Sequence, residues 1–201
     1  MRVAVVGNAP LETDYSAQID ACDIVIRFNA APEYGRNAGL KTTILFLMNS
    51  GKTTQQRLKD PAFLDSALIG GAERVYLPYH PEIIRKYHPK PNLLSRLKGR
   101  RADLTWEIIR KLGERQKRVT ILPPQFYEES CAELGIPEAD RTHVFPSTGF
   151  LGLRYASVSY PAPSWQIKAC AFQWEGWKRH NWQEESRWFK DRLPDANFER
   201  H

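Results

Sequence analysis

The chain has 201 residues, of which 42% are hydrophobic and 26% are charged. These shares match those of soluble globular proteins, so they exclude a disordered, a collagen-like and a coiled-coil protein. The formal net charge is +6, and it is concentrated between Arg85 and Arg118, where twelve Lys and Arg residues are accompanied by only three acidic residues. A chain of this length can bury a real core. We therefore expect residues 1–201 to form a single domain.

The sequence also limits the cellular setting. It contains no run of about 18 uncharged apolar residues, so we expect no membrane-spanning helix. The apolar stretch at the start is interrupted by Gly7 after four residues, which is too short for an export signal. The three cysteines, Cys22, Cys131 and Cys170, are scattered and odd in number. We expect buried reduced thiols and a cytoplasmic location.

Short apolar runs alternate with helical patterns along the chain. We predict strands at residues 3–6, within 21–28, and at 42–48, 73–77, 118–122 and 167–172, and helices at 105–112, 126–134, 150–159 and 182–189. Such alternation favours an α/β fold, here a single Rossmann-like, mainly parallel sheet flanked by helices. Prolines 89 and 91 and Gly99 interrupt the basic segment 85–118, and they predict a loop or mobile segment there.

Two strands are predicted to end in polar residues. Gly7 and Asn8 follow the first strand, and Asn29 follows the second. In parallel sheets the carboxyl ends of strands are where nucleotides bind, and glycine lets the backbone approach a ligand closely. If the two strands are neighbours, Asn8 and Asn29 point into one crevice. A tight turn and a strand cap without a ligand are the simpler explanations of each asparagine taken alone.

Two further segments carry candidate chemistry. Ser147, Thr148 and Gly149 precede an apolar helical run and resemble a helix N-terminus, which favours anions, although Ser147 or Thr148 could be only an N-cap. His180 and Glu185 lie in a tryptophan-rich stretch. Histidine has the pKa that suits proton abstraction near neutrality, but a structural histidine is the more common case. No zinc-binding pattern is present, so we predict no metal site.

In this order and spacing, the segments resemble the sialyltransferases of glycosyltransferase family 29, of the compact bacterial type. Residues 3–48 resemble the large motif of that family and residues 146–149 its small motif, and His180 with Glu185 resembles its very small motif. The resemblance implies a sialyltransferase-type variant of the GT-A fold. It also implies an inverting, metal-independent transfer by direct displacement, in which a CMP-sugar is a substrate and no cofactor is needed.

The resemblance also implies roles for individual residues. The first group, which would contact the ribose and phosphate of the CMP-sugar, comprises Gly7, Asn8 and Asn29. The second group, which would hold the nucleotide and the sugar carboxylate, comprises Ser147, Thr148 and Gly149. His180 would be the general base for the acceptor hydroxyl, and Glu185 would hold its segment in place. A histidine that many members carry in a third motif is missing, and Lys178 or Arg179 could assist the leaving phosphate instead.

Two other classes of function stay open. The first is a non-catalytic nucleotide-binding or accessory protein with the same fold. The second is a nucleic-acid binder that uses residues 85–118, but this segment has only two aromatic residues, so we expect no nucleic-acid partner. The segment could equally be a solvated helix face, or a patch for an anionic sugar nucleotide, a phosphorylated acceptor or peripheral association with an anionic membrane. The acceptor glycan or other hydroxyl is not specified.

Overall fold

A single six-stranded sheet organises the protein, for which the computed structural model describes residues 1–198. The strand order is β5-β4-β3-β2-β1-β6, and every neighbouring pair is parallel. The strands are β1 (Arg2–Val6), β2 (Ile24–Phe28), β3 (Ile44–Phe46), β4 (Arg74–Leu77), β5 (Arg118–Ile121) and β6 (Gln166–Cys170). All six predicted strands and the parallel α/β architecture are thereby confirmed.

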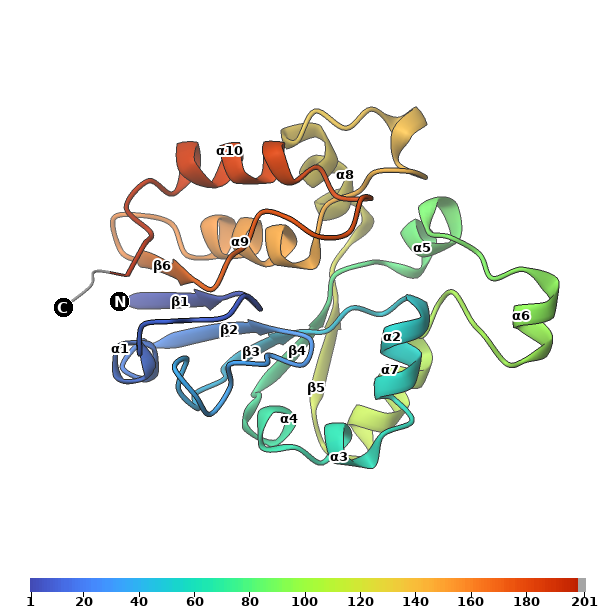
Figure 1. Cartoon of the computed structure of the whole chain (residues 1–201), viewed down its shortest axis with the longest axis horizontal. Helices are drawn as coiled ribbons and strands as arrows, with labels where there is room; N and C mark the ends of the chain where they lie inside the picture. The colour runs from blue at the N-terminus through green and yellow to red at the C-terminus, as the bar shows by residue number, and fades with distance from the viewer. Residues whose placement is uncertain (199–201) are drawn as a thin grey trace.

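Helices cover both faces of this sheet (Figure 1). Helices α8, α9 and α10 lie on one side, and α2, α3, α4 and α7 lie on the other. The ten helices of the described chain are α1 (Ser16–Asp20), α2 (Gly51–Arg57), α3 (Pro61–Leu64), α4 (Ala67–Gly71), α5 (Pro81–Tyr87), α6 (Leu93–Leu97), α7 (Thr105–Gly113), α8 (Pro124–Glu133), α9 (Thr148–Ser159) and α10 (Trp182–Arg192). Within residues 1–198, none of them has the length and apolar character needed to cross a bilayer.

The sequence patterns found four of these helices and missed six. The predictions at 105–112, 126–134, 150–159 and 182–189 correspond to α7, α8, α9 and α10. The missed helices, α1 to α6, have between four and seven residues, which is too short for an amphipathic pattern to show. Pro89, Pro91 and Gly99, which predicted a loop in the basic segment, lie outside the helices. Between them the chain forms α6, which the sequence did not predict and which begins after Asn92, whose Oδ1 accepts a hydrogen bond from Ser95 N–H at 2.9 Å.

Alternate side chains of the strands enter two different cores. In β3 and the residue after it, Ile44 and Phe46 belong to the core under α8, α9 and α10, whereas Leu45 and Leu47 belong to the core under α2, α3, α4 and α7. Burial on both faces explains why the strands read as continuous apolar runs. The cysteine prediction holds in part, because Cys22 and Cys131 are buried free thiols whereas Cys170 is only partly buried.

The strand order creates a crevice at one point of the sheet. Strands β1 to β5 are added successively in one direction, and the chain then returns to place β6 on the other side of β1. In open α/β sheets, the carboxyl ends of the strands at such a reversal are where ligands bind. The ends of β1 and β6 are therefore the first place to look for a functional site.

Candidate functional site

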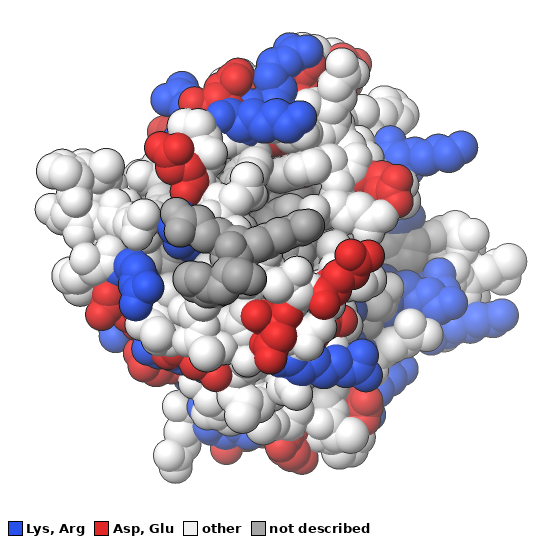
Figure 2. Space-filling model, turned by 60° about the vertical axis from the view of Figure 1, so that its left-hand side comes forward, with Lys and Arg blue, Asp and Glu red and all other residues white. Residues whose placement is uncertain are grey.

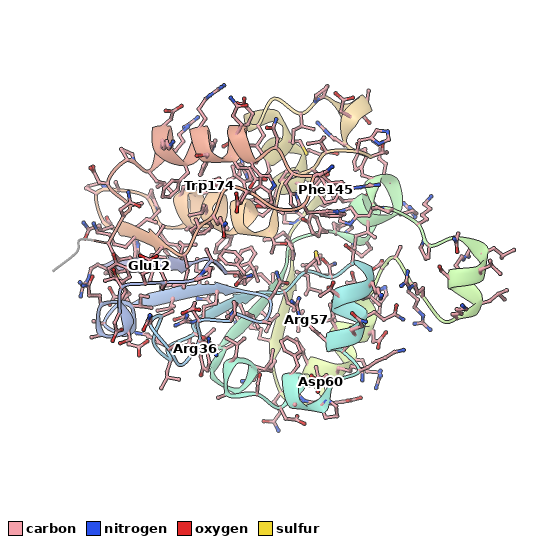
Figure 3. All side chains as sticks on the ribbon, viewed as in Figure 1. Glu12, Arg36, Arg57, Asp60, Phe145 and Trp174 are labelled. Carbon is pink, nitrogen blue, oxygen red and sulfur yellow. The ribbon has the colours of Figure 1, made fainter. Side chains whose placement is uncertain are left out.

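A cavity of about 380 Å³ opens at the carboxyl ends of β1, β2 and β6. Its wall includes seven residues that the sequence singled out: Gly7, Asn8, Asn29, Ser147, Thr148, Gly149 and His180. They come from segments up to 173 positions apart in the numbering, so the fold, not the local sequence, gathers them. In Figure 3 the labelled Trp174 of the cavity lies on the α9–α10 side of the sheet, away from Arg57 and Asp60.

Gly7 is required by close packing between two chain segments at the floor of the cavity. A Cβ atom at this position would overlap the backbone carbonyl of Ala171. The Gly7 N–H donates to Cys170 O at 2.9 Å, and Ala9 N–H donates to Ala171 O at 2.9 Å. Ala171 itself has a φ of 57°, a left-handed conformation that costs free energy for alanine. The ends of β1 and β6 are therefore held together as one rigid unit.

Asn29 adopts the left-handed conformation that asparagine tolerates, with a φ of 54°. Its N–H donates to Phe46 O at 2.9 Å, and its side-chain Oδ1 accepts from Met48 N–H at 3.0 Å. The carbonyl half of the amide is thus used to fix the segment after β3. The NH₂ half remains the part of Asn29 that can donate to a ligand in the cavity, where Asn8 is also placed.

Behind Asn29, the Arg27 side chain is completely buried. Its guanidinium donates to three backbone carbonyls, those of Ala38, Gly39 and Lys41, at 2.6, 3.2 and 2.9 Å. Burial lowers the pKa of Arg27 from its ordinary value. These hydrogen bonds fasten the loop between β2 and β3 to β2, which ends just before Asn29, so Arg27 positions this corner of the cavity.

The N-terminus of α9 points its first peptide groups at the cavity. Ser147 is the N-cap, and its Oγ accepts from Phe150 N–H at 3.0 Å. The same hydroxyl donates to Glu185 Oε2 at 2.6 Å, and Ser147 N–H donates to Glu185 Oε1 at 2.8 Å. The Ser147 side chain is therefore occupied within the protein. The donors left at this helix start are the N–H groups of Thr148 and Gly149, which no helical carbonyl can reach.

Glu185 is completely buried beneath the cavity on α10. Burial raises its pKa to about 7, and the two hydrogen bonds from Ser147 oppose that rise. Its carboxyl group accepts both Ser147 donors and so ties α10 to the start of α9. This geometry suits the supporting role that the sequence suggested for Glu185, because both of its oxygens are engaged away from a substrate.

His180 has one ring nitrogen committed and one available. Its Nδ1 lies 2.8 Å from Phe145 O, and because a carbonyl only accepts, the proton is on Nδ1. The ring packs edge-on against Phe145, Trp177 and Trp182, with centroids 5.3, 5.4 and 4.9 Å away. Burial lowers the pKa of His180 from its ordinary value. The neutral ring therefore carries a lone pair on Nε2 at neutral pH.

Lys178 and Arg179 do not line the cavity, although they precede His180 in the chain. Lys178 is exposed and Arg179 is half-buried, and Arg179 Nη1 donates to Thr142 O at 3.0 Å. The Arg179 backbone contributes differently, because its carbonyl accepts from Phe145 N–H at 2.9 Å. That bond fixes the same peptide segment whose carbonyl orients His180.

A metal-binding cluster would need three or more His, Cys, Asp or Glu side chains close together. Residues 1–198 contain no such group.

An aromatic wall is the part of the cavity that sequence reasoning missed. Phe172, Trp174, Trp177 and Trp182 line it, and the rings of Phe172 and Trp174 stack with centroids 5.6 Å apart. All four lie in residues 172–182, directly after β6, so the tryptophan-rich composition of this stretch was the available signal. Flat apolar rings of this kind can cover a nucleobase or the apolar face of a sugar and exclude water from it.

Comparison with known proteins bears on the family and the fold of the chain. The family model described as glycosyltransferase family 29 (sialyltransferase) matches residues 1–158, so His180 and Glu185 lie beyond the match. No protein with a curated description matches the chain. A crystal structure of a mammalian sialyltransferase superimposes with a TM-score of 0.59 at 21% identity, covering 100% of this chain and 69% of that one.

A second solved structure, a mammalian sialyltransferase in complex with Gal-beta-1-3GalNAc-ortho-nitrophenol, gives a TM-score of 0.55 at 19% identity. It covers 100% of this chain and 70% of that one. At these identities the likeness shows a shared fold. The parallel six-stranded sheet and its flanking helices therefore match the architecture of those structures.

Proposed function

This chain belongs to glycosyltransferase family 29, and from that premise we propose that it transfers sialic acid or a related acidic keto-sugar from a CMP-sugar to an acceptor hydroxyl. The observation that carries the proposal is His180, which is held by Phe145 with its Nε2 lone pair available, in one cavity with the N-terminus of α9. A base and an anion-binding helix start are the two groups that this displacement needs.

We place the donor nucleotide against the strand ends and the start of α9. Asn8 and the NH₂ group of Asn29 are the proposed donors to the ribose and phosphate, and Gly7 keeps the backbone close to them. The N–H groups of Thr148 and Gly149 face the phosphate and the sugar carboxylate, with Ser147 holding that helix start through Glu185. Preorganised donors of this kind stabilise the negative charge that develops on a leaving phosphate.

The transfer itself is a single displacement in this proposal. His180 Nε2 takes the proton of the acceptor hydroxyl as that oxygen bonds to the anomeric carbon of the sugar. The bond between this carbon and the phosphate oxygen of CMP breaks on the opposite side, so the configuration inverts. The aromatic wall of Phe172, Trp174, Trp177 and Trp182 excludes water, which would otherwise compete as the acceptor.

Three finer points belong to the same proposal. We propose the sialyltransferase-type variant of the GT-A fold, a reaction without a metal ion, and a cytosolic setting compatible with the three free thiols. Lys178 and Arg179 enter only as the hypothesis that their side chains assist the leaving phosphate. Unchanged turnover in both Lys178→Ala and Arg179→Ala removes that hypothesis.

Titration calorimetry with CMP tests the proposal first, with UMP, AMP and GMP as controls and EDTA present. We expect selective binding of CMP, followed by release of CMP from CMP-sialic acid when hydroxyl-bearing glycans are added. Binding without transfer or donor hydrolysis would favour a non-catalytic nucleotide-binding protein. No binding to any of the four nucleotides would refute the placement of the donor.

A further inference from the structure

Helix α6 presents an apolar face to solvent at one end of the molecule. Leu93, Leu94 and Leu97 are 71%, 70% and 77% exposed, and their spacing of one, three and four positions places them on one side of the helix. In Figure 1, α6 stands apart at the far right, joined to α5 and α7 by connecting segments. Three adjacent exposed leucines form a patch, which scattered single leucines do not, and such a patch marks an interaction surface.

The same segment is strongly basic. Between Ile83 and Ala102 the chain has seven Lys and Arg residues and no Asp or Glu. Lys86 is paired with Glu138, with Nζ 2.5 Å from Oε1. The other six form no ion pair with any residue in 1–198: Arg85, Lys90, Arg96, Lys98, Arg100 and Arg101. Their charge is therefore available to an anionic partner.

These cations surround a cavity of about 840 Å³ next to α6. Five of the six line it, all but Lys98, and Glu82 and Asp103 are its acidic members. The opposite end of the protein is different, because Figure 2 shows acidic and basic side chains interspersed on that face. The net positive charge of the chain is thus gathered where its most exposed leucines are.

We propose that α6 and the basic residues around it, together the α6 surface, dock on an anionic lipid bilayer. The three leucines enter the interfacial layer, and the six unpaired cations bind the phosphate and carboxylate groups of the lipid heads. A small anionic ligand would use the cations and leave the leucines in water. An apolar protein groove would cover the leucines and leave the cations unmatched. An anionic bilayer satisfies both.

The α6 surface is connected to the cavity of His180 by direct contacts. The His180 ring packs on Phe145, whose ring stacks on His88 with centroids 5.0 Å apart. His88 Nδ1 is 2.8 Å from Ser50 Oγ, and Ser50 forms an isolated β-bridge with Asp103, which lines the basic cavity. Docking would therefore bring the transfer site toward acceptors carried by lipids. That consequence rests on the proposed function, whereas lipid binding itself does not.

Vesicle co-sedimentation tests the proposal without any activity assay. The protein is mixed with vesicles of phosphatidylcholine alone, or of phosphatidylcholine with phosphatidylserine, at low and high NaCl. We expect binding to the mixed vesicles only, and weaker binding at high salt. Equal binding to both vesicles, or to neither, would overturn the proposal. Absence of binding together with a dimer in light scattering would assign the leucines to a contact between two copies.

Two triple variants separate the apolar from the electrostatic contribution. Neutralising Arg96, Arg100 and Arg101 to Gln should lower vesicle binding by about 100-fold, since each cation near an anionic surface contributes about fivefold. Changing Leu93, Leu94 and Leu97 to Ser should lower it by at least about tenfold. The matched controls are Lys59→Gln/Lys190→Gln/Arg192→Gln and the exposed Val158→Ser, which should bind like the wild type.

All the altered side chains are exposed, so we expect unchanged circular dichroism melting curves for every variant. Wild-type binding by the leucine variant would overturn the insertion of α6. Wild-type binding by the arginine variant would overturn the proposed contact between the basic residues and the lipid head groups. Because vesicle binding is measured with no donor or acceptor present, its failure leaves the proposed transferase untouched, and failure of CMP binding leaves this proposal untouched.

Discussion

His180 combines the orientation and the protonation state that a general base requires. Its Nδ1–H is held by Phe145 O, and burial lowers its pKa below the ordinary value of 6.5. We predict that kcat/KM is at its plateau at pH 7 and falls with acidity only below pH 6.5. His180→Ala should lower transfer by about 10²–10⁴-fold and leave CMP affinity nearly intact.

The pH–rate profile and CMP titration of both proteins measure these effects. The matched control is His143→Ala, which removes an exposed histidine outside the cavity. A normal transfer rate in His180→Ala would remove this residue from the base role.

Glu185 makes the folded state bind a proton that the unfolded state releases. The folded pKa is about 7, above the ordinary value of 4.5, so between these pH values the folded protein carries more protons. Stability contributed by this residue therefore falls as pH rises from 4.5 through 7. We compare the unfolding free energy of Glu185→Gln with that of the wild type. From pH 5 to pH 8, this difference should change by about 1–3 kcal/mol in favour of Glu185→Gln.

Urea unfolding of both proteins at the two pH values measures that difference. Taking the difference cancels His88, whose pKa is lowered to about 4 by burial and which acts in the opposite direction. Glu184→Gln, in the same turn of α10, is the control and should stay parallel to the wild type. A constant difference between Glu185→Gln and the wild type would contradict a buried, protonated carboxyl.

At the scale of residues, the sequence could single out residues that line one cavity but not the hydrogen bonds among them. Gly7, Asn29 and His180 were predictable because strand ends and a histidine carry local signals. The bond between Ser147 and Glu185 was not, because the two residues are 38 positions apart and meet only when α10 packs on α9. The commitment of Ser147 to Glu185, which leaves the backbone N–H groups as anion donors, is likewise visible only in the fold.

At the scale of elements, α9 depends on a glycine to reach the sheet. A Cβ atom at Gly152 would overlap the ring of Phe28, so the helix approaches β2 more closely than alanine allows. We predict that Gly152→Ala lowers the unfolding free energy by about 1–3 kcal/mol and weakens CMP binding, because the start of α9 is displaced.

Denaturant titration and calorimetry give the two numbers. Gly113→Ala is a matched control, since Gly113 is also helical but has no neighbouring atom within 4 Å of an added Cβ. It should be neutral or stabilising, as alanine favours a helix more than glycine does. If both variants lost the same stability, the contact with Phe28 would not be the cause.

The short helices show why the prediction of helices failed in the first half of the chain, where the strands were predicted. Helices α3, α4 and α6 each begin at a side chain that caps them, namely Asp60, Ser66 and Asn92. Such residues are equally common in turns, and a helix of one turn is stabilised by packing more than by its own sequence. Only the longer helices α7 to α10 carried enough periodic positions to be recognised.

At the scale of the whole molecule, the parallel sheet was predictable and the strand order was not. Alternating strands and helices imply parallel pairing, but nothing local says that β6 pairs with β1. That pairing carries the aromatic wall and His180 to the ends of β1 and β2. The aromatic composition of residues 172–182 could therefore be recognised as a cavity wall only once the strand order was known.

Since the proposed nucleotide site joins distant segments, its occupant should stabilise the entire fold. At a CMP concentration 100 times its Kd, we predict a gain of about 2.7 kcal/mol in unfolding free energy. For a chain of this size each kcal/mol raises Tm by about 2–4 °C. Scanning calorimetry with CMP and with UMP measures the shift. Asn8→Ala should lose most of it at the same CMP concentration, and an equal shift with UMP would contradict base selectivity.

The position of β6 beside β1 also sets the order in which the protein can become active during synthesis. Strand β1 leaves the ribosome early, yet one of its two edges has no partner until residues 166–170 follow. Until then the nascent chain exposes an apolar strand edge, which invites misassembly. Gly7, Asn8 and Asn29 of the proposed nucleotide site are likewise translated long before His180. Under the proposed function, a growing chain acquires its general base only after β6 has been made and the sheet can close.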